Sequence, residues 1–314
     1  MPDILIIILT LIGLSLFEIV TSVDNAVINA DVLSTMSKKA RRWFLIWGIF
    51  IAVFLIRGLL PLLIVYSLNP DAGLVGAFTA AFSEDPTIIQ AIEAASPPLL
   101  MAGGGFMLFL FLNWLFLQPK YYGLKGEEFI ARHGVWFFAI VSVLLSGLVW
   151  YSIQINGLMA FGAAVGSSIF FIVHGFRENA EKREKEMIGD TAMSDWSKIM
   201  YLEVIDASFS IDGVLGAFAF TLSVPIILIG NGIGAITVRQ ITVKNIDTVR
   251  KYKYLKNGAM YSVGILGVIM VANAFGMHIP EWLSPVSTIV ILSYFFIKSK
   301  RAVDSGEMNG LTRK

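Results

Sequence analysis

Long apolar runs restrict the fold of this chain more than any other feature of its sequence. Ile and Leu fill most of residues 4–16, and similar runs recur up to residue 297. A transmembrane helix needs about 20 apolar residues, and this length predicts about nine transmembrane helices. Their approximate bounds are 4–31, 43–67, 98–117, 134–153, 157–176, 199–221, 223–239, 257–277 and 281–297. The predicted fold class is all-α, a polytopic membrane protein with one transmembrane domain over residues 1–314.

The composition agrees with this fold and argues against several functions. Charged residues make up 15% of the chain, whereas a typical soluble domain has about 25%. The net charge of +1 argues against a nucleic-acid partner. The chain has no Cys and only three scattered His residues, so thiolate sites, cysteine nucleophiles and zinc-type clusters are not expected. We predict no catalytic residues, no permanently bound cofactor and no enzymatic activity.

Basic residues predict the orientation of the spans. If the N-terminus lies outside, each predicted inner loop and the C-terminal tail carry Lys and Arg, while the predicted outer loops carry none. Of the 24 Lys and Arg residues, Arg57 alone is assigned to the interior of a span, where it pairs with a carboxylate or extends toward the outer interface. The positive-inside rule therefore predicts a multi-pass protein with its N-terminus outside and its C-terminus inside.

Two predicted spans carry carboxylates inside an apolar run, and their acidic motifs match each other. Each motif has an acid, a serine four residues later and an aspartate two residues after that. The first motif is Glu18, Ser22 and Asp24, and the second is Asp206, Ser210 and Asp212. The two spans run in opposite directions, which is typical of inverted repeats with a binding site near the bilayer midplane. We predict a first repeat at about 3–118, a second at about 199–297 and a cytoplasmic connector at about 177–198.

The acidic motifs are candidates for a cation site. An intramembrane charge costs roughly 2.5–3.5 kcal/mol on insertion scales, so such residues are functional candidates by default. Asn25 follows the first motif, and Glu203 precedes the second by about one helical turn. Carboxylate, amide and hydroxyl oxygens suit hard divalent cations such as Mg²⁺, Ca²⁺ and Mn²⁺. Alternatively some of the acids carry protons, because clustered buried carboxyl groups favour protonation, and an antiporter uses both roles.

Helix geometry limits how the two acids of one motif act together. Asp24 follows Glu18 by six residues, which places it about 120° away around an ideal helix. Both acids reach one point only if the helix unwinds near Ser22–Asn25, or else each faces a different partner. In the second motif, Gly213 would ease such a break. The sequence leaves open whether the two motifs form one site or two.

Four stretches carry a family resemblance. They are Glu18-x-x-x-Ser22-x-Asp24-Asn25, Phe209-Ser210-Ile211-Asp212, Trp47-Gly48 to Arg57, and Tyr254-Leu255-Lys256-Asn257-Gly258 through His278-Ile279-Pro280. In these motifs the chain resembles the TerC family of integral membrane proteins. The resemblance implies a prokaryotic cytoplasmic (inner) membrane, Mn²⁺ export, a historical link to tellurium resistance, and roles alongside protein secretion or membrane insertion. It also implies metal-associated positions at Glu18, Asp24, Asn25, Asp206 and Asp212, whereas Gly213 departs from the polar residue that many members carry there.

The predicted function is a secondary transporter that exports a divalent cation, with Mn²⁺ as the expected substrate, by alternating access between the two repeats. The predicted metal ligands are Glu18, Ser22, Asp24, Asn25, Asp206, Ser210 and Asp212, with Glu203 and Arg57 as further candidates. The alternative is a non-transporting membrane partner that assists secretion, membrane insertion or metal loading of exported proteins. The expected partners are the lipid bilayer, the divalent cation, and either a second copy of the chain or the secretion machinery.

Overall fold

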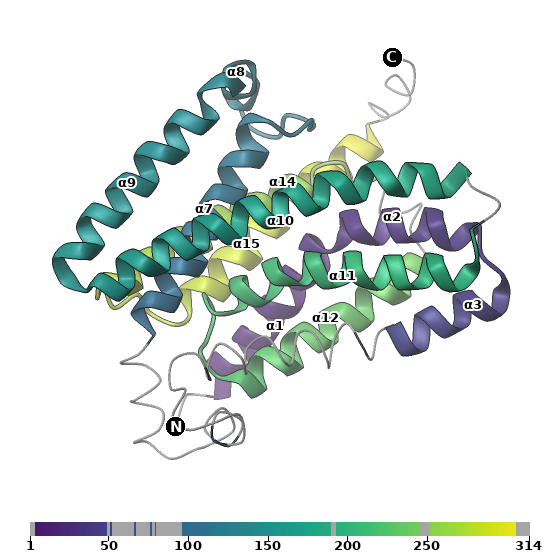
Figure 1. The fold of residues 1–314 in the computed structure, drawn as a ribbon, viewed down its shortest axis with the longest axis horizontal. Helices are drawn as coiled ribbons and strands as arrows, with labels where there is room; N and C mark the ends of the chain where they lie inside the picture. The colour runs from purple at the N-terminus through teal and green to yellow at the C-terminus, as the bar shows by residue number, and fades with distance from the viewer. Residues whose placement is uncertain are drawn as a thin grey trace.

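The computed structural model describes residues 4–48, 96–189, 193–244 and 251–305, and the isolated positions 51, 66, 76 and 79. Every regular element within these ranges is a helix, as the sequence predicted. The elements are α1 (Ile4–Thr21), α2 (Val23–Ser34), α3 (Lys38–Trp43), η1 (Phe44–Gly48), α7 (Pro97–Phe116), α8 (Glu127–Arg132), η4 (Gly134–Trp136), α9 (Phe137–Ile155), α10 (Gly157–Gly189), α11 (Asp195–Ala217), α12 (Val224–Lys244), α14 (Leu255–Ala274) and α15 (Leu283–Asp304) (Figure 1).

Six helical segments within the described ranges are long and apolar enough to cross a membrane. They are Ile4–Thr21, Pro97–Phe116, Gly134–Ile155, Gly157–Asn179, Val224–Ile241 and Leu255–Ala274. The protein is therefore an all-α, multi-pass membrane protein. The predicted span 43–67 lies largely outside the described residues. The spans predicted at 199–221 and 281–297 correspond to α11 and α15, which carry more charged residues than the six apolar segments.

Helix α15 crosses the bundle although it is less apolar than its neighbours. Near its start, the hydroxyl of Ser284 donates to the carbonyl of Ala219, just after α11, at 2.5 Å. Near its end, the hydroxyl of Ser299 accepts from the backbone nitrogen of Tyr254, just before α14, at 2.9 Å. The helix therefore runs from the end of α11 to the beginning of α14, which is the path that the predicted ninth span requires.

Two of the loops between helices contact the starts of helices that come later in the chain. Lys198, near the start of α11, donates to the hydroxyl of Thr35, just after α2, at 3.0 Å. Asn257, near the start of α14, donates to the carbonyl of Tyr121, in the loop after α7, at 2.9 Å. The loop after α2 therefore lies beside the start of α11, and the loop after α7 lies beside the start of α14.

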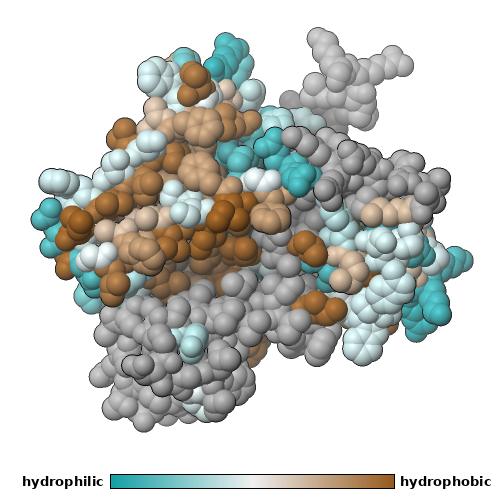
Figure 2. Space-filling view, in the orientation of Figure 1, coloured by the Kyte–Doolittle hydropathy of each residue, from teal (hydrophilic) through white to brown (hydrophobic). Residues whose placement is uncertain are grey.

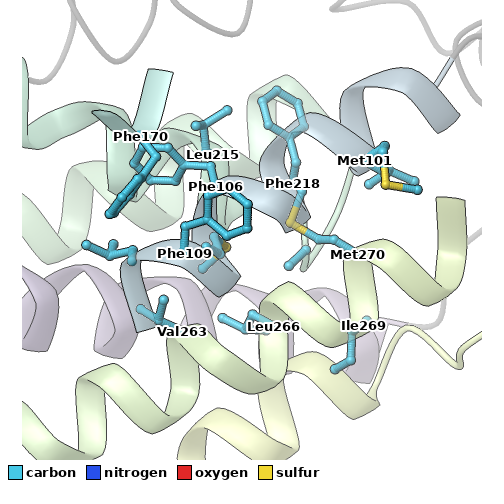
Figure 3. Packing of buried hydrophobic residues seen from close by; sticks show 14 of the residues in the cluster. Met101, Phe106, Phe109, Phe170, Leu215, Phe218, Val263, Leu266, Ile269 and Met270 are labelled. Carbon is cyan, nitrogen blue, oxygen red and sulfur yellow. The ribbon is translucent and has the colours of Figure 1, made fainter. Parts of the chain in front are cut away.

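The core forms where α7 packs against α10 and α14. Figure 3 shows Phe106 and Phe109 of α7 beside Phe170 of α10, with ring centroids 6.2 and 5.8 Å from the Phe170 ring. On the opposite side of α7, a β-carbon added at Gly104 would lie 3.0 Å from the carbonyl oxygen of Gly267. Glycine thus lets the backbones of α7 and α14 approach closely, and such packing holds membrane helices together where lipid offers no hydrophobic drive.

The outer face of α9 has the character of a lipid-facing surface. Phe138 is 62% exposed, Val143 73% and Trp150 66%. Figure 2 shows hydrophobic side chains over the part of the molecule where α9 and α10 lie in Figure 1, with hydrophilic side chains toward α8 and α3. Because lipid tails solvate such side chains, these exposed apolar residues are consistent with a helix at the periphery of a membrane bundle.

The regular helix is interrupted at Ser22, between the end of α1 at Thr21 and the start of α2 at Val23, but the chain does not unwind there. The backbone nitrogen of Ser22 donates to the carbonyl of Glu18 at 3.1 Å, and that of Ala26 donates to the carbonyl of Ser22 at 2.9 Å. Ser22 also keeps right-handed helical angles, with φ −89° and ψ −2°. Helix α11 is likewise continuous through Gly213. The interruption at Ser22 is therefore limited to one residue, and the break that Gly213 would ease is not present in α11.

Candidate functional site

The two acidic motifs lie on antiparallel helices that face each other, as the order of the predicted spans indicated. A β-carbon built on Gly213 of α11 would lie 2.6 Å from Oε2 of Glu18 on α1. Farther along the chain, Nδ2 of Asn29 on α2 donates to Oδ1 of Asp206 on α11 at 2.9 Å. The contact positions rise along α1–α2 as they fall along α11, so the two segments run in opposite directions.

Glu18 occupies a notch made by two glycines. Besides the approach to Gly213, a β-carbon on Gly234 of α12 would lie 2.6 Å from Cβ of Glu18 and 2.9 Å from the carbonyl oxygen of Ser15. The side chain is 1% exposed, and its Oε1 accepts a hydrogen bond from Ser22 Oγ at 2.6 Å. The role of Gly213 is therefore to admit the Glu18 carboxylate and not to break α11.

Asp212, the last acid of the second motif, pairs with Arg177 of α10. The ion pair joins Nη2 of Arg177 to Oδ2 of Asp212, and these side chains are 16% and 14% exposed. The other carboxylate oxygen of Asp212 is buried and has no hydrogen-bond partner within the described ranges. The charge of Glu18 also acts on Asp212. Glu18, Ser22, Arg177 and Asp212 are called the Asp212 group below.

Asp206, the first acid of the second motif, is held by Arg239 of α12. Nη2 of Arg239 donates to Oδ2 of Asp206 at 3.0 Å, while Asn29 donates to Oδ1. Nη1 of Arg239 donates to the carbonyl of Phe44 in η1 at 2.7 Å, and its guanidinium lies 4.3 Å from the centre of the Phe44 ring. Both oxygens of Asp206 are therefore occupied by donors from other helices.

Glu203 lies beside the same Arg239 guanidinium as Asp206, but its carboxylate has fewer hydrogen-bond partners. Its Oε1 is 3.9 Å from Nη2 of Arg239, an ion pair without a hydrogen bond. The residue is 7% exposed, and neither carboxylate oxygen accepts a hydrogen bond from the part of the chain that the structure describes. A β-carbon on Gly48 would lie 2.0 Å from Oε1, so the backbone of η1 covers this carboxylate. Asn29, Glu203, Asp206 and Arg239 are called the Asp206 group below.

The acids are thus distributed over two ion-paired groups along α11. Asp206 and Asp212 are six residues apart, which is about 9 Å along a helix axis. The hydroxyl of Ser210 donates to the backbone carbonyl of Asp206 at 2.6 Å, so it satisfies its own helix. Among the described residues, no cluster of three or more His, Cys, Asp or Glu side chains has the arrangement of a metal site. The side chains of Asp24 and Asn25, and all of Arg57, lie outside the described part of the chain.

Most of the chain matches one known protein family. Residues 23–304 match the family described as "Protein of unknown function (DUF475)". The chain belongs to the DUF475 family. One similar curated protein is the "Uncharacterized membrane protein YceF" of Bacillus subtilis (strain 168), 29% identical over 102 residues. That match covers 32% of this chain and 38% of the relative, so it spans well under half of each. No solved structure matches the chain.

Most of the candidate site lies within the DUF475 match. Both acids of the second motif, both arginines and Asn29 fall between residues 23 and 304, whereas Glu18 and Ser22 precede this range. The DUF475 protein thus carries buried carboxylates whose charges are offset by guanidinium groups from neighbouring helices. Such a pair is stable only while both partners stay together, because removing one leaves an uncompensated buried charge. Chemically, the carboxylates can exchange an arginine for another cation or for a proton.

Sequence reasoning missed the partners of the acids in this DUF475 protein. The positive-inside rule assigns Arg177 and Arg239 to inner loops, because each lies at the end of a predicted span. Arg239 had a usable signal, since Gly230-Asn231-Gly232 to Arg239 echoes Trp47-Gly48 to Arg57 after the matching motif. Asn29 had a weaker one, as an amide in the same predicted span as Glu18. No comparable sequence signal marked Gly234 as a wall of the Glu18 notch.

Proposed function

We propose that this protein is a secondary transporter that exports a divalent cation, with Mn²⁺ as its substrate. The observation that carries the proposal is the pairing of intramembrane acids with arginines from other helices, in the Asp206 group and the Asp212 group. Charged side chains within a membrane bundle pair with one another and mark ion pathways. Because the acidic helices are antiparallel, the arrangement suits the interface of an inverted repeat.

In the proposed cycle the arginines bind the carboxylates while the substrate cation is absent. Both oxygens of Asp206 are occupied, by Arg239 and Asn29, so a cation reaches this carboxylate only when the guanidinium withdraws. The same applies to Oδ2 of Asp212, which Arg177 occupies. Exchange of an arginine for a cation keeps the carboxylate compensated at each stage, which avoids the several kcal/mol, in order of magnitude, that an unpaired buried ion costs.

The donor set favours a hard cation. Carboxylate oxygens line both groups, with the Asn29 amide in the Asp206 group and the Ser22 hydroxyl in the Asp212 group, and the chain has no Cys. Mn²⁺, Mg²⁺ and Ca²⁺ all accept such ligands, whereas Cu(I) prefers sulfur. The resemblance to the TerC family selects Mn²⁺ among these cations.

The proposal couples export to protons. The sequence carries no nucleotide-binding motif, so uphill movement draws on an ion gradient. Glu203 suits the role of proton carrier because its carboxylate is buried, 3.9 Å from Arg239, and accepts no hydrogen bond from the described residues. Protonation of Glu203 as Arg239 withdraws would replace the positive charge that the guanidinium takes away, so the charge of the Asp206 group would stay the same until the cation binds.

The test is Mn²⁺ flux into proteoliposomes under an imposed proton gradient. We compare the unmodified protein with Asp206→Asn and Asp212→Asn, and use Asp304→Asn as a matched control because Asp304 is exposed at the end of α15. The proposal expects flux in the unmodified protein and the control, and at least a tenfold loss (about 1.4 kcal/mol in free energy) in each site variant. Size-exclusion profiles establish that the variants remain folded.

Two results would count against this assignment. Flux retained in both site variants would show that these acids do not carry the substrate. Absence of flux in the unmodified protein under every ion gradient, together with crosslinking to secretion components, would favour the non-transporting membrane partner. Competition by Mg²⁺ and Ca²⁺ in the same assay measures which divalent cation the site prefers.

A further inference from the structure

A second polar cluster lies at the end of the bundle where α7 stops and α14 begins. The loop 117–126 is fastened there by Lys298 of α15, whose Nζ donates to the carbonyl of Gly123. Asn257 of α14 donates to the carbonyl of Tyr121 at 2.9 Å. A β-carbon on Gly123 would lie 2.8 Å from Nδ2 of Asn257, so the loop packs directly on α14. The loop, α14 and α15 therefore form one packed unit at this end.

Four lysines converge on this unit, and we call them the lysine cluster: Lys120, Lys253, Lys256 and Lys298. The ammonium of Lys253 lies 5.3 Å from the ring centres of both Tyr121 and Tyr254. The ammonium of Lys298 lies 5.2 Å from the centre of the Tyr254 ring. Lys120 donates to the carbonyl of Trp114 at 2.7 Å, and Lys256 directly precedes Asn257, which donates to the carbonyl of Tyr121 in the same loop. Backbone carbonyls and aromatic rings thus hold much of this positive charge.

The carboxylate buried among these lysines is already saturated by neutral donors. Oε2 of Glu127 accepts from the backbone nitrogen of Gly123 at 2.7 Å and from Asn257 at 3.1 Å. Oε1 accepts from the backbone nitrogen of Leu124 at 3.0 Å and from the hydroxyl of Tyr261 at 2.9 Å. Glu127 therefore braces the loop, and its single negative charge leaves the lysine cluster with a net positive charge.

The surroundings of the cluster match the level of lipid headgroups. Tyr121 is 52% exposed and Tyr122 47%, while Phe129 and Trp136, just beyond the loop, are 69% and 59% exposed. Exposed aromatic residues at the ends of membrane helices are typical of the interface between the hydrocarbon core and water. Figure 1 shows the short helix α8, which carries Phe129, at the tip of the pair formed by α7 and α9. The positive charge and the aromatic rings therefore occupy the same end of the bundle.

From this placement we propose that the lysine cluster binds the phosphate headgroup of an anionic phospholipid. Ammonium groups between membrane helices attract anionic headgroups, and the exposed aromatic residues beside them suit an occupant that also has acyl chains. Free phosphate supplies the charge but cannot use this apolar rim. The lipid would bridge the loop 117–126, α14 and α15, and so stabilise their packing.

The experiment measures lipid retention by native mass spectrometry and melting temperature in detergent, with phosphatidylglycerol or phosphatidylcholine added. The test variant is Lys253→Gln/Lys256→Gln. The matched control is Lys38→Gln/Lys39→Gln, which removes the same charge from exposed positions of α3. The unmodified protein and the control should retain phosphatidylglycerol and gain several degrees in melting temperature. The test variant should lose at least three-quarters of the bound lipid and most of the thermal shift.

Two further arms make the result decisive. Lys253→Arg/Lys256→Arg keeps the charge and should keep the lipid, so that a binding loss in the Gln variant is not ascribed to misfolding. Inorganic phosphate at 10 mM should leave the bound phosphatidylglycerol in place. Equal retention by the test variant and the control would overturn the proposal. Full displacement by phosphate, or equal stabilisation by phosphatidylcholine, would overturn it as well.

Discussion

The guanidinium of Arg239 donates to the carboxylate of Asp206 at 3.0 Å and to the backbone carbonyl of Phe44 at 2.7 Å. One side chain of α12 thereby fixes an acid of α11 and the start of η1. The acid lies 33 residues earlier in the chain, and the carbonyl lies 195 residues earlier. Arg239 thus connects the helix of the second acidic motif to the segment that follows the first.

Replacing Arg239 by Gln should strongly destabilise the protein. Asp206 would remain buried without its counter-charge, and breaking such a pair costs about 3–5 kcal/mol. Thermal unfolding in detergent measures the change. The control is Arg132→Gln, because Arg132 pairs with Glu128 on the surface, where the side chains are 73% and 54% exposed, and such pairs contribute little. The double variant Arg239→Gln/Asp206→Asn should recover part of the loss. Equal stability of Arg239→Gln and the control Arg132→Gln would contradict this role for Arg239.

Replacing Gly234 by Ala should disturb the notch around Glu18. The added methyl would lie 2.6 Å from Cβ of Glu18 and 2.9 Å from the backbone oxygen of Ser15, and the backbone cannot yield as a flexible side chain does. Overpacking of this kind costs about 1–3 kcal/mol. Gly147→Ala in α9 is the control, since nothing lies within 4 Å of its added methyl. Melting temperatures should fall for Gly234→Ala alone, and a fall of the same size in both would remove the steric explanation.

The sequence predicted the helical bundle from the apolar length of its segments, and the antiparallel course of the acidic motifs from the number of predicted spans between them. Apolar length marks α1, α7 and α14, and the repeated acid-Ser-Asp spacing marks the two motifs. The partners of the acids could not be predicted in this way. Arg177 and Arg239 pair with acids 35 and 33 residues away, and only the packing of whole helices determines which long side chain reaches which carboxylate.

Gly213 shows a different limit of sequence reasoning. Glycine following an intramembrane aspartate is compatible both with a helix break and with close approach of a neighbouring side chain. The structure has the second, with Glu18 Oε2 2.6 Å from the position of an added β-carbon. The two uses differ in tertiary contacts that a single sequence does not contain, so the choice between them required the arrangement of α1 beside α11.

The stability of the protein should rise with pH between about 8 and 10.5 through Lys120, which lies outside the membrane-spanning helices. Burial lowers the pKa of Lys120 from 10.5 to about 8, with Glu127 raising it and Lys256 lowering it further. Above pH 8 the folded protein releases this proton, while the unfolded chain keeps it up to its ordinary pKa. The unfolded state then binds more protons, so the free energy of unfolding increases with pH over this window.

The measurement is the difference in melting temperature between the unmodified protein and Lys120→Met across pH 7 to 10.5. Met keeps the apolar packing of the side chain but cannot titrate. The melting temperature of the unmodified protein should rise relative to that of Lys120→Met as pH rises through 8. Lys120 is half-buried, so solvent screening makes the change smaller than a fully buried lysine would give. A difference that stays constant over this range would show that Lys120 is not desolvated.

Replacing Arg177 by Gln should tighten the binding of Mn²⁺ and slow its transport. In the proposed cycle Arg177 competes with the substrate for Asp212, so its removal leaves the carboxylate available to the cation. The absence of the competing guanidinium should lower the dissociation constant about tenfold, or about 1.4 kcal/mol. The same variant should transport Mn²⁺ more slowly, because no guanidinium remains at position 177 to displace Mn²⁺ from Asp212. Isothermal titration of Mn²⁺ and flux in proteoliposomes measure the two quantities.

Arg177→Lys separates competition from simple loss of structure. A lysine at this position retains the positive charge but lacks the planar fork of the guanidinium, so its affinity for Mn²⁺ should fall between those of the unmodified protein and Arg177→Gln. Asp212→Asn should weaken binding, whichever residue occupies position 177. If Arg177→Gln instead weakened Mn²⁺ binding while remaining folded, Arg177 would have to position Asp212 for the substrate. The competition mechanism would then be wrong, although the transport proposal itself would stand.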